Sequence, residues 1–150
     1  MEPLLPLFTN DLLREVDQKL YDLLSSITEK DWQKQIAVDG WSVKDVLSHL
    51  VDVILRRLSA GRDRYTPAKA VVLDRYQDLV NYVEDLADQW VGTFRRVSPQ
   101  LVLSLFHDYQ DALYKYFCSL NPYDLALGVA WANESVSCVW FDLAREYSEH

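Results

Sequence analysis

An apolar stripe at helical spacing runs through residues 43–58, and few residues interrupt patterns of this kind anywhere in the chain. Its side chains recur every three or four positions, which predicts an amphipathic helix with one buried face. The stripe consists of Val43, Val46, Leu47, Leu50, Ile54 and Leu58. Only four Gly and five Pro occur among 150 residues, so long helices are favoured over a turn-rich β fold.

The start of this helix carries capping signals. Ser42 suits the N-cap, and Asp45 three residues later completes the pattern of a capping box. His49 lies in the middle of the helix, on the flank of the stripe beside Val53. Because a flank position can face a crevice between helices, His49 is either a metal ligand or a histidine at a helix edge.

The same periodicity predicts four further helices, over residues 10–27, 73–96, 99–120 and 136–150. The first is expected to bury Leu13, Val16, Leu20, Leu23, Leu24 and Ile27. The helix over 73–96 is expected to pack along a seam of Leu73, Tyr76, Val80, Val83, Ala87, Trp90 and Phe94. Four main amphipathic helices and a longer crossover predict an all-α four-helix bundle, in one domain over residues 1–150.

Cap and loop signals divide these helices. Thr9 or Asn10 can cap the first helix, and Gly61 is a natural stop after residue 60. Residues 123–133 lack a clear period, so we expect a crossover loop packed against the bundle. Asn133 or Ser135 can then cap the last helix.

Charge and composition exclude several classes of function. The 15 Lys and Arg residues are outnumbered by 23 Asp and Glu residues, for a formal net charge of −8. No basic patch is therefore available for nucleic acid or an anionic membrane. No apolar run approaches the roughly 18 residues that span a bilayer, and no signal peptide is recognisable, so we expect a cytoplasmic protein. Cys118 and Cys138 lie among apolar residues and are expected to be buried, reduced thiols.

The last helix contributes the other candidate metal ligands. Glu146 and His150 are one turn apart, so their side chains share a helix face. If that face meets His49, two imidazoles and a carboxylate could hold a divalent metal with positions left open for water and substrate. His107 lies off its helix's apolar stripe and is expected at the surface.

Four segments together resemble the DinB-like superfamily, which includes the mycothiol-dependent maleylpyruvate isomerase N-terminal domains. They are DGWSVKDVLSHLVD at 39–52, RLSAGRDR at 57–64, VAWANES at 129–135 and AREYSEH at 144–150. The resemblance implies an up-down-down-up four-helix bundle, often dimeric. It also implies a metal ligand at His49, and two more ligands one turn apart on the last helix, as HxxxH or ExxxH.

The resemblance leaves two registers open for the last helix. In one, Glu146 and His150 are the ligands; in the other, Glu149 is the carboxylate and its histidine partner lies beyond the chain end. We expect that the natural protein continues past His150, although a frayed helix end is the alternative. Arg145 is either a substrate-anion group or, as we favour, part of a surface salt bridge. Trp41, Trp131 and Glu134 also match family positions. The two tryptophans either line a pocket or close the core, whereas Glu134 can stabilise the start of the last helix through its dipole.

Two functions remain in competition. Relatives include thiol-dependent S-transferases and isomerases, which suggests a metal-dependent enzyme acting on a small molecule. It would use a divalent metal, Zn or Ni, and a low-molecular-weight thiol, with the metal-bound thiolate as nucleophile. The alternative is a metal-free bundle, serving as a small-molecule binder or a dimeric stress-response module. A homodimer is expected in either case.

Overall fold

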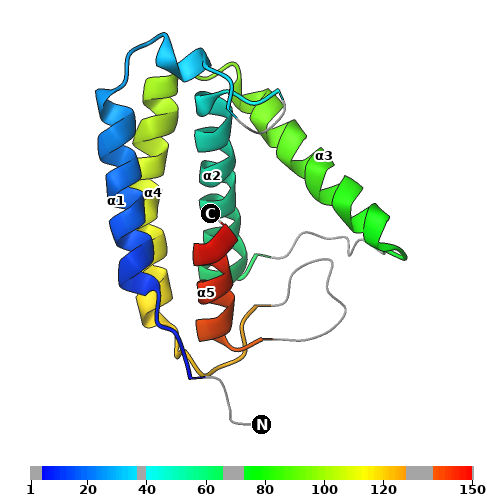
Figure 1. Ribbon diagram of the computed structural model, residues 1–150. Coiled ribbons are helices and arrows are strands. Elements are labelled where there is room, and N and C mark those ends of the chain that lie inside the picture. The colour runs from blue at the N-terminus through cyan, green and yellow to red at the C-terminus, as the bar shows by residue number, and fades with distance from the viewer. Residues whose placement is uncertain (1–4, 37–39, 66–72, 128–136, 150) are drawn as a thin grey trace.

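The computed structural model describes residues 5–36, 40–65, 73–127 and 137–149. These residues form an all-α bundle, which confirms the predicted class (Figure 1). The helices are α1 Asn10–Ser26, α2 Val43–Arg57, α3 Tyr76–Phe94, α4 Pro99–Ser119 and α5 Val139–Glu149, with a 3-10 turn η1 at Asp31–Gln33 and a π-helical turn η2 at Leu58–Arg62. The up-down-down-up order stays a prediction.

The core lies where α1, α2, α4 and α5 meet. Figure 1 shows α1 alongside α4, while α2 packs on α4 and α5 lies against α2 and α1. The stripe predicted for the helix beginning at residue 43 is confirmed at Leu47, Ile54 and Leu58, which are buried. The other buried apolar residues of the core include Leu24, Trp32, Val51, Val102, Phe106, Leu113, Phe117, Val139 and Leu143.

The inward face of α1 differs from the predicted stripe. The predicted burial of Val16 and Leu23 is wrong, because their exposed fractions are 42% and 59%. Leu13, Leu20 and Leu24 do face the core, and the position between the first two is filled by the half-buried Asp17. An i, i+4 step from Leu13 therefore places a carboxylate, rather than Val16, on the packed side of the helix.

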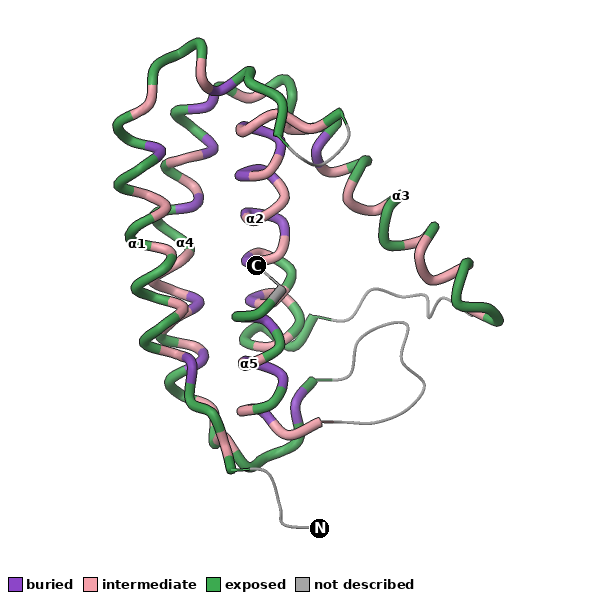
Figure 2. The backbone as a smooth tube through the Cα atoms, viewed as in Figure 1, coloured by how far each residue is buried: buried purple, intermediate pink, exposed green. Residues whose placement is uncertain are grey.

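The seam predicted for α3 holds only near its C-terminal end. Tyr76 and Val83 are 80% and 41% exposed, and Leu73 precedes the helix. Figure 1 shows α3 diverging from the other helices, and in Figure 2 its buried colour is confined to the end near α2. There Val91 is buried and Trp90 Nε1 donates a 2.9 Å hydrogen bond to the carbonyl oxygen of Ser48. Divergence of the helix axes explains why a regular sequence seam is only partly buried.

Two of the predicted cap positions differ in outcome. Gly61 does not end α2, because it lies within η2, where the side chain of Tyr116 occupies the space a Cβ atom would need. Thr9 stands at the N-cap of α1 but makes no capping hydrogen bond through its side chain. A glycine is required at position 61 by close packing rather than by helix termination.

The crossover before α5 is described only at its two ends. The backbone N–H of Ala126 donates a 2.7 Å hydrogen bond to the carbonyl oxygen of Ser137, and Leu125 bridges to Cys138. Asn133 and Ser135, the predicted caps, lie outside the described residues. The chain thus enters α5 from a short backbone pairing next to the ends of α1 and α4.

The cysteines and His107 can also be placed. Cys118 and Cys138 form no disulfide, but their expected burial is wrong: Cys118 is exposed, with its Sγ 3.9 Å from Asn10 Nδ2, and Cys138 is only partly buried. The His107 side chain is 50% exposed, which confirms its surface position. Within the described ranges, every helix is too short or too polar to cross a lipid bilayer.

Candidate functional site

The start of α2 is fixed by the predicted capping box. Ser42 Oγ accepts a hydrogen bond from the backbone N–H of Asp45, and Asp45 Oδ2 accepts one from the backbone N–H of Ser42. Burial would raise the pKa of Asp45, but hydrogen bonds from Ser42 and the guanidinium of Arg95 hold it below its ordinary value. The first turn of α2 is therefore anchored before the chain reaches His49.

His49 follows two turns later and is half-buried. Its ring centroid lies 5.4 Å from that of Trp41, with the planes tilted by 51°. On a helix, positions 49, 53 and 57 lie within one broad face. His49, Val53 and Arg57 therefore point to the same side of α2, and Arg57 shows that this side meets α5.

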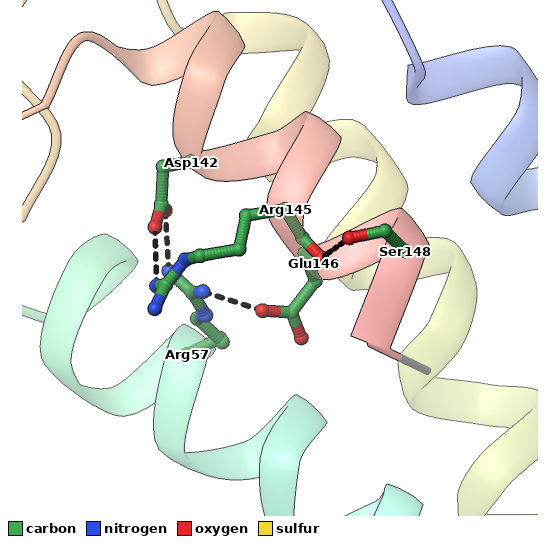
Figure 3. A network of polar contacts seen from close by, with 5 residues as sticks. All are labelled: Arg57, Asp142, Arg145, Glu146 and Ser148. Atoms are coloured by element: carbon green, nitrogen blue, oxygen red, sulfur yellow. Dashed lines mark hydrogen bonds and ion pairs between the residues drawn. The ribbon is translucent and has the colours of Figure 1, made fainter.

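Arg57 joins α2 to α5 through two carboxylates (Figure 3). Its Nη1 donates to Asp142 Oδ2 at 2.7 Å, and its Nη2 donates to Glu146 Oε2 at 2.5 Å. The side chain of Arg57 is 19% exposed, and those of both carboxylates are 10% exposed. Arg145 Nη2 adds a bond of 2.9 Å to Asp142 Oδ1, which confirms the expected salt bridge of Arg145. We call Arg57, Asp142, Glu146 and Arg145 the ion cluster.

The ion cluster is largely charge-balanced. Burial would lower the pKa of Arg57, but Glu146 and Asp142 together raise it above its ordinary value. Two guanidinium groups face two carboxylates, so no net charge is buried between α2 and α5. Removing any one member would leave a buried charge without compensation.

The two helices run in opposite directions at this contact (Figure 1). Arg57, at the end of α2, meets Asp142 near the beginning of α5 and Glu146 one turn later. His49 is eight residues, or about 12 Å, back along α2. The same distance forward along α5 leads from the ion cluster to the end of the helix at Glu149 and beyond.

The candidate metal ligands are thus only partly placed. Glu146 is buried and bound to Arg57, and His49 lies on the same side of α2 as Arg57. Glu149 is the last residue of α5, and His150, Trp131 and Glu134 lie outside the described residues. Among the side chains that the structure describes, no three His, Cys, Asp or Glu residues are close enough to hold a metal ion. Both proposed registers need a ligand from the final residues.

Arg57 and Asp142 are members of the site that sequence reasoning missed. In the sequence, the arginine pair at residues 56–57 needs no site to explain it, because cations are favourably placed at a helix C-terminus. The available signal was spacing, because Arg57 lies two turns after His49 on the same flank. Arg56 pairs instead with Asp52 within α2, so only one of the two arginines reaches α5.

A small cavity opens beside Glu146. It has a volume of about 60 Å³ and lies between α1, α2, α4 and α5. Leu50, Val53 and Phe106 contribute apolar wall, and Asp17 of α1 also lines it. The described half of the candidate site therefore combines a buried ion cluster with a mostly apolar cavity.

Comparison with known proteins identifies the family. The model of the mycothiol maleylpyruvate isomerase N-terminal domain matches residues 13–150, almost the entire chain. The chain belongs to this family. It is thereby a member of the DinB-like superfamily, which confirms the resemblance carried by the sequence motifs. No curated protein and no solved structure matches the chain.

The family provides a context for the α2–α5 contact. The DinB-like superfamily includes metal-dependent enzymes with thiol-related chemistry. In the present mycothiol maleylpyruvate isomerase N-terminal domain, the helices that carry His49 and Glu146 are joined by an ion pair.

Proposed function

We propose that this domain is a divalent-metal-dependent enzyme of the thiol S-transferase or isomerase kind. His49 and a carboxylate–histidine pair from the last helix would hold the metal, and Zn or Ni suits such ligands. Family membership supports the proposal. The observation that carries it is that α2 presents the side bearing His49 and Arg57 to α5, where Glu146 is buried.

The donor atoms present fit such a metal. Imidazole and carboxylate groups are ordinary ligands of Zn, and Glu146 is only 8% exposed, so its carboxylate is shielded from bulk water. Arg57 holds that carboxylate in one orientation, as outer groups do for metal-binding side chains. A bound divalent cation would polarise a carbonyl group or lower the pKa of a thiol or water ligand.

The protein's own residues contribute orientation and exclusion of water. Arg57 and Asp142 fix α5 against α2, so that the last turns of α5 are directed along the side of α2 that bears His49. Leu50 and Val53 line the cavity beside Glu146 with apolar surface. A small-molecule substrate would approach through the side left open by these residues.

The antiparallel contact bears on the two registers. The level of His49 corresponds to the end of α5 or beyond, about two turns after the ion cluster. If Glu146 and His150 are the ligands, Glu146 lies at the level of the ion cluster and His150 lies nearer the level of His49. If Glu149 is the carboxylate, a further histidine beyond residue 150 is required. We keep both registers as proposals.

Metal analysis tests the function. Protein purified without chelator or affinity metal should contain about one divalent ion per chain, and His49→Ala should lose it. His107→Ala is the matched control, since His107 is a half-exposed histidine of α4. Full metal content in His49→Ala would remove the proposal. Measuring the chain beside a C-terminally extended version separates the registers: metal in both supports Glu146 and His150, and metal only in the extended version supports Glu149.

One observation favours the alternative function, a metal-free binding or dimeric stress-response module. Arg57 already neutralises Glu146, so burial of that carboxylate needs no metal. This function predicts no metal in either chain and unchanged assembly in His49→Ala. A bound ion together with a thiol-dependent reaction would eliminate it.

A further inference from the structure

Asp17 is an ionisable residue on the packed side of α1 that the proposed site does not use. Its side chain is half-buried, and it makes no hydrogen bond or ion pair with any residue in the described part of the chain. Burial raises its pKa to about 6. An unpaired carboxylate in this position destabilises the fold at neutral pH, and such residues are frequent at functional sites.

Asp17 lines the same cavity as Glu146. The cavity lies between them and is closed on the α2 side by Leu50 and Val53, which carry no charge. A water molecule takes up about 30 Å³ in the liquid. The cavity, of about 60 Å³, therefore has room for water or for the reactive end of a ligand.

Asp17 also reaches the protein surface. It lines an open depression between α1 and α4, together with Gln18, His107 and Asp111. Its carboxylate thus borders the interior cavity on one side and solvent on the other. A carboxylate that borders both a cavity and solvent can exchange protons between a buried ligand and water.

We propose that Asp17 is a proton-transfer residue of the site that contains Glu146. A thiol or hydroxyl group of a ligand in the cavity would give its proton to Asp17: the S–H or O–H bond breaks, an O–H bond forms on the carboxylate, and the ligand becomes the anion. The proton then passes to water in the surface depression. This inference rests on the proposed function and deepens it, because it names the acceptor that would generate a nucleophilic anion.

The charged groups around Asp17 set the expected behaviour. Arg14 of α1, three residues of α4 (His107, Asp108 and Asp111) and Glu146 of α5 border the cavity or the depression, while α2 contributes only apolar residues. Removing the charge of Glu146 should therefore lower the pKa of Asp17, because one nearby negative charge disappears. A change of about half a pH unit is expected for two carboxyl groups that line one small cavity.

The test follows the Asp17 carboxyl carbon by NMR as pH is varied, in the wild-type chain and in Glu146→Gln. Asp22 provides the control, because it is an exposed carboxylate of α1 paired with Gln18. We expect Asp17 to titrate near pH 6 in the wild-type chain and at a lower pH in Glu146→Gln. The titration of Asp22 should be the same in both proteins. An Asp17 titration that is normal, or unaffected by Glu146→Gln, overturns the inference.

A second measurement uses Co²⁺ alone as the probe. If the loaded protein shows a pH-dependent visible spectrum, Asp17→Asn should shift that transition by about one pH unit or abolish it, and Asp22→Asn should not. Co²⁺ binding with identical pH profiles in all three proteins contradicts the role of Asp17. Absence of Co²⁺ binding contradicts the metal-dependent function instead. In that case the NMR titration of Asp17 in Glu146→Gln still decides whether Asp17 and Glu146 share a site.

Discussion

The Nη2 atom of Arg57 lies 2.5 Å from Oε2 of Glu146, so the last helix is fastened to α2 by a charge-assisted hydrogen bond inside the bundle. The same guanidinium binds Asp142 one turn earlier on α5. One arginine thus sets both the distance and the axial register between the helices that carry the candidate ligands. Four predictions concern this contact and its surroundings.

Replacing Arg57 with glutamine should destabilise the fold. The change removes the guanidinium that Asp142 and Glu146 share, and the loss of one partner from a buried ion pair costs about 3 kcal/mol or more. Urea unfolding at pH 7 measures the difference. Arg62→Gln is the control: Arg62 pairs with Asp63 where both side chains are about half exposed, so we expect little or no change in the free energy of unfolding. Equal effects of the two substitutions would contradict the buried contact.

Asp17→Asn should stabilise the protein at neutral pH and leave its stability unchanged in acid. The folded-state pKa of Asp17 is raised from 3.8 to about 6, so the native state binds more protons than the unfolded state between these values. The free energy of unfolding therefore falls as pH rises from about 4 to 6, and the deficit persists above pH 6. After allowance for partial solvent exposure, we expect a gain of about 1–2 kcal/mol at pH 7.

Denaturant unfolding at a series of pH values tests this prediction. The difference between wild type and Asp17→Asn should grow from near zero at pH 4 to its full value above pH 6. Asp22→Asn, at an exposed position of the same helix, should track the wild type throughout. A constant difference across the series would show that the amide acts through packing rather than through charge.

Gly61→Ala and Gly92→Ala should change stability in opposite directions. A Cβ atom at Gly61 would overlap the ring and hydroxyl of Tyr116, and overpacking of this kind costs about 1–3 kcal/mol. At Gly92 in α3 a Cβ atom meets nothing within 4 Å, so alanine should stabilise the helix by up to about 1 kcal/mol. Thermal unfolding compares the two. The cost of Gly61→Ala should shrink when Tyr116 is also replaced by leucine.

Ser42→Ala should weaken the start of α2. The substitution removes the oxygen that accepts the backbone N–H of Asp45, which typically costs about 1 kcal/mol. Ser25→Ala is a suitable control, since the Ser25 hydroxyl bonds only to a carbonyl within its own exposed helix face. Hydrogen exchange of the first amides of α2 should become faster in Ser42→Ala alone. Unchanged protection there would mean that the cap is not needed to hold this turn.

Local patterns were sufficient for the helices and the start of α2. The capping box at Ser42 and Asp45 is a short-range arrangement, so spacing alone predicted both of its hydrogen bonds. Leu47 and Ile54 were predicted as core for the same reason, because helical periodicity fixes which residues share a face. The family motifs likewise identified the family without reference to the fold.

Other features depend on where a helix meets its neighbours. Val16 was expected inside and Asp17 was overlooked, because periodicity gives the shape of a stripe but not its rotation by one position against α4 and α5. The predicted burial of Tyr76 in the seam of α3 is wrong for a related reason, because α3 diverges from α2.

Some features of the candidate site could likewise be predicted from the sequence, and others depend on how the helices pack. The sequence by itself determined an all-α bundle and its capped second helix, and it made His49 and Glu146 candidate ligands. Only the tertiary structure decided that Glu146 is held by Arg57 and that Asp17 borders its cavity. These pairs are separated by 89 and 129 residues in the chain. No local spacing encodes such contacts, because they arise from the packing of helices whose relative rotation and offset are fixed by the whole core.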